Sequence, residues 1–483
     1  MKPSIPKGTR DFSPLEMNRR NYIFDTIKKV FQKYGYQQIE TPAMENLKTL
    51  TGKYGEEGDK LIYKIRSNKN LLERYPELRD CKCLKETYPY DWIPMASDKA
   101  LRYDLTIPFA RYVVMHQNEI TFPFKRFQFQ PVWRADNPQK GRYREFFQCD
   151  ADVIGSDSLL NEIDLLLIID EVFTALNIKV TIKINNRKII SGIAESIGTP
   201  ERMVEIATAI DKYDKIGEEG IKLELSQKNF SPDQISKIFE IILMEQGKIN
   251  YLGIAQKQDI NLNKLNFLKN GSNVRDSIII QKGIKETEEI LFALTNINNK
   301  INFDLKLARG LNYYTGAILE VVANDPKSTF TSSICGGGRY DDLTGVFGLP
   351  NVSGVGISFG VDRIYDVLEE IGFPEINNID STQVLIYNYF SKDQSVYLDL
   401  INKIRAAGIN AELYPDPADK GNSNKLQKKQ FEYAKSKNIP FTIAIEEINN
   451  WKPVVKNVAN KTTKILEFES FIEDLKLFMD SNK

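Results

Sequence analysis

Histidine is almost missing from this sequence of 483 residues, because His116 is the only one. A Ser-His-Asp triad and a multi-histidine metal site both need this side chain, so the sequence excludes most arrangements built on catalytic histidines. His116 lies in the run Phe109–Gln117, which has the pattern of a helix, and we interpret it as structural. Catalysis is therefore expected to rest on the placement of charges.

Cysteine is also scarce, and no pair of cysteines has the spacing of a redox motif or a zinc site. The chain has four cysteines, two of which form the close pair Cys81 and Cys83. No apolar run reaches about 18 residues, so no membrane span is expected. The first residues lack the apolar stretch of a secretory signal. These absences fit a protein of the reduced cytoplasmic compartment.

Excess charge of either sign is absent too, since Lys plus Arg and Asp plus Glu both number 65. Net charge therefore gives no evidence for a nucleic-acid partner, and any RNA binding must use local patches. The length predicts two to four domains at roughly 100–200 residues each.

The most informative stretch runs from Phe124 to Ile154, where two alternating segments flank a turn-rich middle. Alternation with period two predicts strands, and Asp136-Asn137-Pro138 and Lys140-Gly141 are typical of loops. We therefore expect an antiparallel hairpin with an apolar and a polar face. The polar face would carry Arg126, Gln128, Gln130, Arg134, Arg142, Arg144, Phe146, Gln148, Asp150 and Asp152.

This polar face has the chemistry of a nucleotide site. Arginine supplies planar, bidentate donors suited to phosphate. Phe146 offers a stacking plane for a base, and Gln148 and Asp152 could bind a cationic or hydrogen-bonding substrate. The pattern alone is equally compatible with an edge hairpin that carries cross-strand ion pairs.

The same stretch resembles a known family. Val132–Pro138, Gly141–Phe146 and Gln148–Asp150 resemble motif 2 of class II aminoacyl-tRNA synthetases, in the version of the histidyl-tRNA synthetases. Upstream, Ser13-Pro14-Leu15-Glu16 is a capping box that predicts a helix ending at Gly35, followed by a strand over Tyr36–Thr41. This order resembles motif 1, which builds the dimer of the class, although a core helix and strand fit the pattern equally well.

Three later segments extend the resemblance. Ala308–Gly316 and Cys335–Asp341 resemble the two signature peptides of histidyl-tRNA synthetases, although Asn312 stands where many members have Asp. Gly356–Glu370 resembles motif 3 and predicts a strand followed by a helix. Arg363 falls in the first turn of that helix, where a cation is unfavourable by about 0.3–1 kcal/mol. A bound anion or the adjacent Asp362 could offset this cost.

The resemblance implies specific roles. Asp104 and Thr106 would hold the α-amino group of histidine, although they could equally cap the helix expected from about Phe109. Gln148 would also bind the amino group, and the imidazole would be bound by Asp152, Tyr313 and Tyr314. The reacting carboxylate and the α-phosphate would be held by Arg134 and Arg309. The outer phosphates would be held by Arg142 and Arg363, with Mg²⁺, and Phe146 would stack on adenine. No residue is assigned as a metal ligand.

The resemblance covers nearly the whole chain and implies an α+β fold, in which helices flank a class II antiparallel sheet. The implied parts are the catalytic domain over 1–204 and 296–372, a helical insertion domain over 205–295, a linker over 373–382 and an α/β anticodon-binding domain over 383–483. Residues 67–98 are interpreted as an insertion of unknown role. A hairpin-like unit is expected over Phe303–Val322, and the helix after Ser231 is expected to end at Gly247.

The implied activity is ATP-dependent ligation of L-histidine to tRNA(His) through histidyl-adenylate, by a homodimer without a membrane partner. Two alternatives belong to other classes. One is a catalytically silent relative that regulates histidine biosynthesis, and such relatives generally lack the C-terminal domain. The other is an RNA-binding or sensing module without activity. The intact Arg134, Arg309 and Arg363 argue against the second alternative, and Asn312 is the one feature in its favour.

Overall fold

The computed structural model describes residues 2–66, 97–243, 257–271, 274, 276–294, 296–308, 313–374, 382–389, 394–417, 423–445 and 449–482. The predicted insertion therefore lies outside the described residues except for Ser97 and Asp98, and so do Arg309, Asn312 and Gly247. The chain forms two compact units, Met1–Pro374 and Glu375–Lys483. The finer division of the first unit into catalytic and inserted domains stays a prediction.

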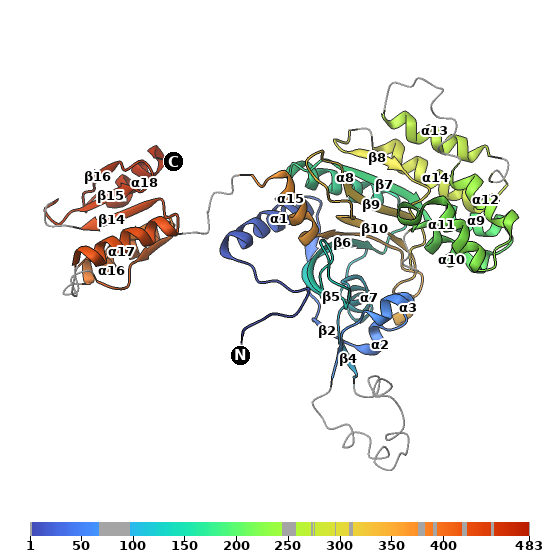
Figure 1. Cartoon of the computed structure of the whole chain (residues 1–483), viewed down its shortest axis with the longest axis horizontal. Coiled ribbons are helices and arrows are strands. Elements are labelled where there is room, and N and C mark those ends of the chain that lie inside the picture. Colours follow the sequence, from blue (N-terminus) through green and yellow to red (C-terminus); the bar gives the residue numbers. More distant parts are fainter. Residues whose placement is uncertain are drawn as a thin grey trace, which may run out of the picture. The chain divides into compact units, whose positions relative to one another are not determined.

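An eight-stranded sheet lies at the centre of the first unit (Figure 1). Neighbouring strands are antiparallel except for parallel pairs at the two edges, β1 with β5 and β7 with β8. The predicted fold class, a largely antiparallel sheet flanked by helices, is thus confirmed. The strand order is β1 (Gln37–Gln38), β5 (Phe124–Trp133), β6 (Glu145–Ile154), β11 (Gly354–Gly360), β10 (Cys335–Tyr340), β9 (Ala317–Ala323), β7 (Val180–Asn186) and β8 (Lys300–Phe303).

Strands β5 and β6 form the predicted hairpin, paired in register from Phe124 opposite Ile154 to Trp133 opposite Glu145. The two faces also follow the alternation. Phe127 and Cys149 enter the hydrophobic core. Some polar side chains of the opposite face, those of Arg126, Gln128, Asp150 and Asp152, are nevertheless buried. The hairpin therefore carries a polar layer into the interior of the unit.

Four helices cover the apolar side of the sheet: α1 (Pro14–Lys33), α8 (Leu160–Ala175), α14 (Ile278–Ala293) and α15 (Val361–Ile371) (Figure 1). Helix α1 begins with the predicted capping box, in which Ser13 and Glu16 bond each other's backbone N–H groups. Its residues Ile23, Ile27 and Phe31 recur every four positions, so they share one buried face. This spacing fixes the side of α1 that packs against the sheet.

The region predicted to be a helical insertion is mainly helical where it is described. It contains α10 (Met203–Ile210), α11 (Tyr213–Gln227), α12 (Pro232–Ile242) and α13 (Lys257–Lys269), after α9 (Arg187–Ser196) and the 3₁₀ turn η2 (Pro200–Arg202). The capping box of Ser231 and Gln234 begins α12 as predicted. Apolar residues of these helices join the core behind the sheet, so the insertion shares that core.

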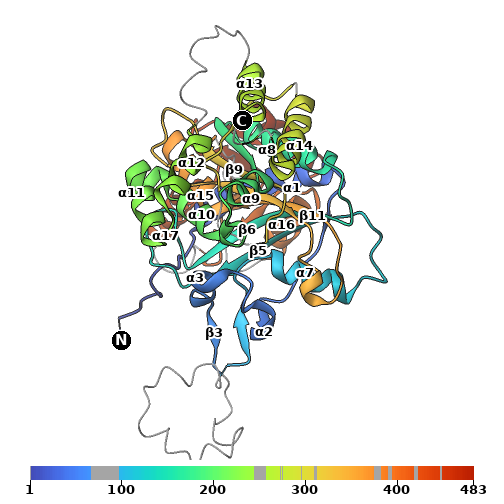
Figure 2. The same ribbon diagram turned by 90° about the vertical axis from the view of Figure 1, so that its right-hand side faces the viewer.

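A smaller sheet lies beside the polar face of the hairpin, and Figure 2 shows it together with α2 and α3 at one end of the unit. Its strands are β2 (Met44–Asn46), β4 (Lys99–Leu101) and β3 (Lys64–Ile65), and the helices beside it are α2 (Leu47–Leu50), α3 (Gly55–Lys60) and α7 (Thr106–Met115). Buried residues of α2, β4 and α7 form a second apolar cluster with Tyr340 and Leu343. The 3₁₀ turn η4 (Gly345–Phe347) follows Leu343 and packs against this cluster through Phe347.

Two predictions about strands were wrong. Phe303–Val322 is not a hairpin, because β7 lies between β8 and β9 and pairs with both. The strand predicted over Tyr36–Thr41 is limited to Gln37–Gln38. Its end leaves the ladder because the Gln130 side-chain amide bonds both the N–H and the carbonyl oxygen of Thr41, each at 3.1 Å.

The second unit is an α/β domain, as predicted. Its five-stranded sheet has the order β13 (Ala411–Leu413), β12 (Val384–Ile386), β14 (Phe441–Ile445), β15 (Pro453–Asn457) and β16 (Thr463–Ile465). The helices are α16 (Ser395–Ala406), α17 (Ser423–Ser436) and α18 (Phe471–Ser481). Apolar residues of the strands and of α16 and α18 form a core of their own.

Candidate active site

A cavity of about 410 Å³ lies over the polar face of the β5–β6 hairpin, in the size range of small-molecule sites. A smaller chamber with lining residues in common lies next to it. The predicted residues Asp104, Thr106, Arg134, Arg142, Phe146, Gln148, Tyr313, Tyr314 and Arg363 all line the main cavity. Asp152 lines the smaller chamber, and Arg309 is outside the described residues.

One end of the cavity is rich in arginine. The Arg134 Nε donates to the carbonyl oxygen of Tyr103 at 3.1 Å. Its guanidinium lies 4.2 Å from the centre of the Tyr103 ring and 5.2 Å from that of Phe146. Contact with two aromatic rings restricts the side chain of Arg134 and places its charge beside the ring expected to stack on a base.

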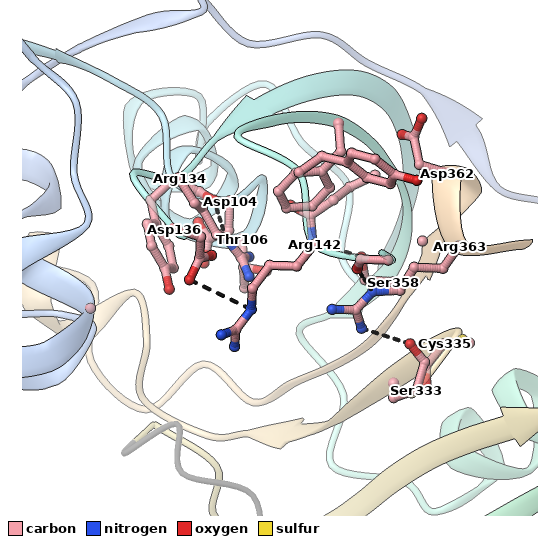
Figure 3. Close-up of a pocket in the computed structure, with 18 of the residues that line it drawn as sticks. Asp104, Thr106, Arg134, Asp136, Arg142, Ser333, Cys335, Ser358, Asp362 and Arg363 are labelled. Atoms are coloured by element: carbon pink, nitrogen blue, oxygen red, sulfur yellow. Dashed lines mark hydrogen bonds and ion pairs between the residues drawn. The ribbon is translucent and has the colours of Figure 1, made fainter. Parts of the chain in front are cut away.

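Arg142 lies in the loop between β5 and β6, where its Nε is 3.6 Å from Asp136 Oδ1. Its side chain is 49% exposed, so this arginine can still meet a ligand that enters from solvent. Figure 3 shows Arg142 in the open part of the cavity, on the side of Asp136.

Arg363, in the first turn of α15, donates to the carbonyl oxygens of Gly141 at 2.8 Å and Ser333 at 2.7 Å. Figure 3 shows it pointing away from the side chain of Asp362. Asp362 instead accepts from the guanidinium groups of Arg20, at 2.6 Å, and Arg10. Its charge is therefore shared with those two arginines.

Asp104 marks the opposite end of the cavity, between β4 and α7. Its Oδ1 accepts from the Ile107 N–H at 3.2 Å and from the Tyr54 hydroxyl at 3.0 Å. No described residue bonds Oδ2. Burial raises the pKa of Asp104 despite the nearby charge of Arg134. The carboxylate therefore stabilises the start of α7 with one oxygen, and no described residue bonds the other, so the two interpretations from the sequence are compatible.

Asp152 occupies a buried polar network beneath the cavity. Its Oδ2 lies 2.6 Å from Arg126 Nη2, and its Oδ1 accepts from the Tyr340 hydroxyl at 2.6 Å. Burial raises the pKa of this carboxyl group. A Cβ at Gly356 would lie 1.9 Å from Asp152 Oδ1, so only glycine fits on the facing strand.

The sequence alone indicated no role for Arg126 or Tyr340, although Arg126 lies in the predicted hairpin and Tyr340 in the second signature peptide. Gly336, the first of three successive glycines on β10, lines the cavity. At Gly337, however, a Cβ would lie 2.0 Å from the Gly356 carbonyl oxygen, so this glycine serves the contact between β10 and β11.

The N-terminal segment is a contributor that the sequence did not reveal. The Gly8 carbonyl oxygen accepts from the Arg144 N–H at 2.8 Å. The Arg10 guanidinium lies 3.7 Å from the centre of the Tyr143 ring. The segment thereby holds the end of the β5–β6 loop that carries Arg142.

Within the described ranges, no group of three or more His, Cys, Asp or Glu side chains could hold a metal ion. No helix in the same part of the chain is long and apolar enough to cross a membrane.

Comparisons with known proteins show the family of this chain. The family model described as histidyl-tRNA synthetase matches residues 97–364. The chain is also 51% identical to the histidine–tRNA ligase of Bacteroides fragilis over 478 residues, which cover 98% of each protein. The chain belongs to the histidyl-tRNA synthetase family. The resemblance read from the motifs is thereby confirmed.

Solved structures of the histidyl-tRNA synthetase family share the fold. The enzyme from a Nostoc species is 29% identical, with a TM-score of 0.74 over 99% of this chain and 100% of that one. A Bacillus halodurans protein described as an ATP phosphoribosyltransferase regulatory subunit/histidyl-tRNA synthetase is 19% identical, with a TM-score of 0.66 over 89% and 97%. The second likeness concerns the fold alone.

Proposed function

We propose that this member of the histidyl-tRNA synthetase family activates L-histidine with ATP and transfers the histidyl group to tRNA(His). One observation carries the proposal: a single cavity joins arginines suited to phosphates with a buried acidic end suited to an amino acid. The first step forms histidyl-adenylate and pyrophosphate, and the second esterifies the 3′-terminal adenosine of the tRNA.

In the first step a carboxylate oxygen of histidine attacks the α-phosphorus of ATP, and the bond to pyrophosphate breaks. Arg134 would hold the oxygens on which negative charge builds up, and Arg142 and Arg363 would hold the outer phosphates. Preorganised positive charge is an effective way to catalyse such a transfer. It needs no histidine base, which agrees with the single His116 outside the cavity.

Arg309 would assist Arg134, on the basis of its position in the first signature peptide. Phe146 would stack on adenine beside Arg134. Mg²⁺ would be held chiefly by the phosphates and water, as is usual for this ion. The acids of the phosphate end fit such an arrangement, because Asp136 and Asp362 already lie beside arginines. The ion would neutralise part of the phosphate charge.

At the acidic end, Asp104, Thr106 and Gln148 would hold the α-ammonium group. Asp152, with Tyr313 and Tyr314, would read the imidazole. An amino acid whose side chain cannot hydrogen-bond to these buried residues would leave their polar groups without partners. The cost of these lost hydrogen bonds would discriminate strongly against amino acids other than histidine.

The second unit would recognise the anticodon, and the helical insertion would contact the acceptor arm. The exposed Lys428 and Lys429 on α17 offer a basic surface for the anticodon stem. We also propose that the protein is a homodimer that works in the cytoplasm, as the resemblance of α1 and β1 to motif 1 and the low cysteine content suggest.

A regulatory, catalytically silent protein is the second candidate, because the sequence alone left this alternative open. The presence of the second unit and of the arginines around the cavity favours the enzyme. ATP–pyrophosphate exchange with each of the twenty amino acids separates the two. We expect exchange with histidine alone. A folded protein that binds ATP but shows no exchange would support the regulatory candidate.

A further inference from the structure

A line of three polar side chains connects the floor of the smaller chamber to the main cavity. Ser358 on β11 lies directly opposite Asp150 on β6, and Gln148 is two residues before Asp150 on the same face. Gln148 Nε2 donates to Ser358 Oγ at 2.9 Å. The Ser358 and Asp150 side chains face the same chamber from neighbouring strands, and the Ser358 hydroxyl acts on the Asp150 carboxylate so as to lower its pKa. Neither Asp150 nor Ser358 has a role in the function proposed above.

The direction of these hydrogen bonds depends on Asp150. A hydroxyl has one proton to donate, and an ionised carboxylate can only accept. Ser358 therefore gives its proton to Asp150 and turns a lone pair toward Gln148. The amide NH₂ of Gln148 fills that place, so its oxygen Oε1 faces elsewhere. Oε1 is buried and has no hydrogen-bond partner among the described residues, while Gln148 lines the main cavity.

We propose that Asp150 is a positioning residue that acts through Ser358 to turn the Gln148 amide oxygen toward the α-ammonium group of the amino acid. The inference rests on the proposed function, in which Gln148 binds that group. An amide turned the other way would present NH₂ to the ammonium, which can only donate. The side chain of Asp150 would thus affect binding without touching the ligand.

The charges around Asp150 make this orientation depend on pH. Arg126 on β5, Asp152 on β6 and Asp104 before α7 act on it, and Tyr313, Tyr314 and Tyr340 line the same chamber. Burial, opposed by Arg126, raises the pKa of Asp150 to about 7. Below this pH the carboxyl group is protonated and can donate to Ser358. Ser358 then donates to Gln148, and the amide oxygen turns away from the cavity.

Two ligands that differ only in the α-amino group test the proposal. L-Histidinol has the amine, and 3-(imidazol-4-yl)propan-1-ol lacks it. Their dissociation constants are measured by calorimetry, which requires no turnover. In Asp150→Asn, Arg126 attracts the new amide oxygen and leaves NH₂ toward Ser358. We expect histidinol to bind about 10- to 100-fold more weakly, the scale of one hydrogen bond to a charged group. Binding of 3-(imidazol-4-yl)propan-1-ol should be unchanged.

Two further variants separate positioning by Asp150 from a general effect on the pocket. In a Ser358→Ala background, Asp150→Asn should have no additional effect, because the connection is already broken. Asp170→Asn changes another buried aspartate, which bonds Asn298 and Asn299 away from the cavity, and should leave the ratio of the two affinities unchanged. The ratio of the histidinol dissociation constant of Asp150→Asn to that of the wild type should decrease as pH falls below about 7. The titration of the ligand itself affects both proteins equally and cancels in this ratio.

Equal weakening of both ligands in Asp150→Asn would mean general damage to the pocket and would overturn the proposal. Unchanged histidinol binding, or additive effects in the double variant, would overturn it as well. A wild-type protein that binds neither ligand would instead contradict the proposed function, and the inference would fail with it.

Discussion

Replacing Asp104 with asparagine removes one negative charge from the acidic end of the cavity and keeps the shape of the side chain. The asparagine oxygen can take the place of Oδ1 and accept from the Ile107 N–H and the Tyr54 hydroxyl, as the carboxylate does. The amide nitrogen then occupies the place of Oδ2, which no described residue bonds. The start of α7 should therefore be preserved, while a cationic ligand meets a donor in place of an acceptor.

The expected loss can be estimated from this geometry. One hydrogen bond between charged groups is worth about 1.5–3 kcal/mol, which corresponds to about 10- to 150-fold in kcat/KM for histidine. The Michaelis constant for ATP should not change, because the arginines of the phosphate end are untouched. Burial raises the pKa of Asp104, so the wild type should also lose affinity for histidine as pH falls through that pKa. Asp104→Asn should lack this dependence.

Steady-state ATP–pyrophosphate exchange measures these quantities, and urea unfolding reports stability. Asp104→Ala is the matched control, because it loses the contacts to Ile107 and Tyr54 in addition to the charge. It should be destabilised relative to Asp104→Asn by about 0.5–2 kcal/mol, as for other lost helix caps. An Asp104→Asn protein with wild-type kcat/KM for histidine would refute the assignment of the acidic end.

Three other variants probe the phosphate end and its support. Arg363→Ala should raise the Michaelis constant for ATP more than that for histidine, and an equal rise in both would contradict its role at the outer phosphates. Arg309→Ala should lower kcat strongly while circular dichroism stays unchanged, and normal turnover would remove Arg309 from the mechanism. Asp362→Ala leaves the buried Arg20 without its partner and should cost about 3–5 kcal/mol in urea unfolding; unchanged stability would mean that the pair is not needed for folding.

Local pattern predicted those parts of the fold whose partners are near in sequence. The β5–β6 hairpin followed from alternation over two strands joined by the loop 134–144. Helices α1 and α12 followed from capping boxes and apolar spacing. The unit around Phe303–Val322 was misjudged because β7, more than one hundred residues earlier, inserts between its strands. A pairing between segments so far apart leaves no trace in a local pattern.

In the candidate site, too, local motifs predicted some residues, and contacts between distant segments were found only in the structure. The motifs brought Asp104, Arg134 and Arg363 to one cavity, because each lies in a segment with its own signature. The support of Asp362 by Arg20 joins residues 342 positions apart, and no pattern indicated it. The partner of Asp150 was likewise invisible, since Ser358 meets it only through the pairing of β6 with β11. Sequence resemblance thus indicates which residues form the site, and the structure shows how they are oriented.

The central claim is ligation of histidine to tRNA, and direct charging tests it most simply. The purified protein is incubated with ATP, unfractionated bacterial tRNA and each labelled amino acid in turn, and the charged tRNA is identified by hybridisation. The account predicts that histidine alone is attached, and only to tRNA(His). Attachment of another amino acid, or no attachment by a folded protein that binds ATP, would contradict it.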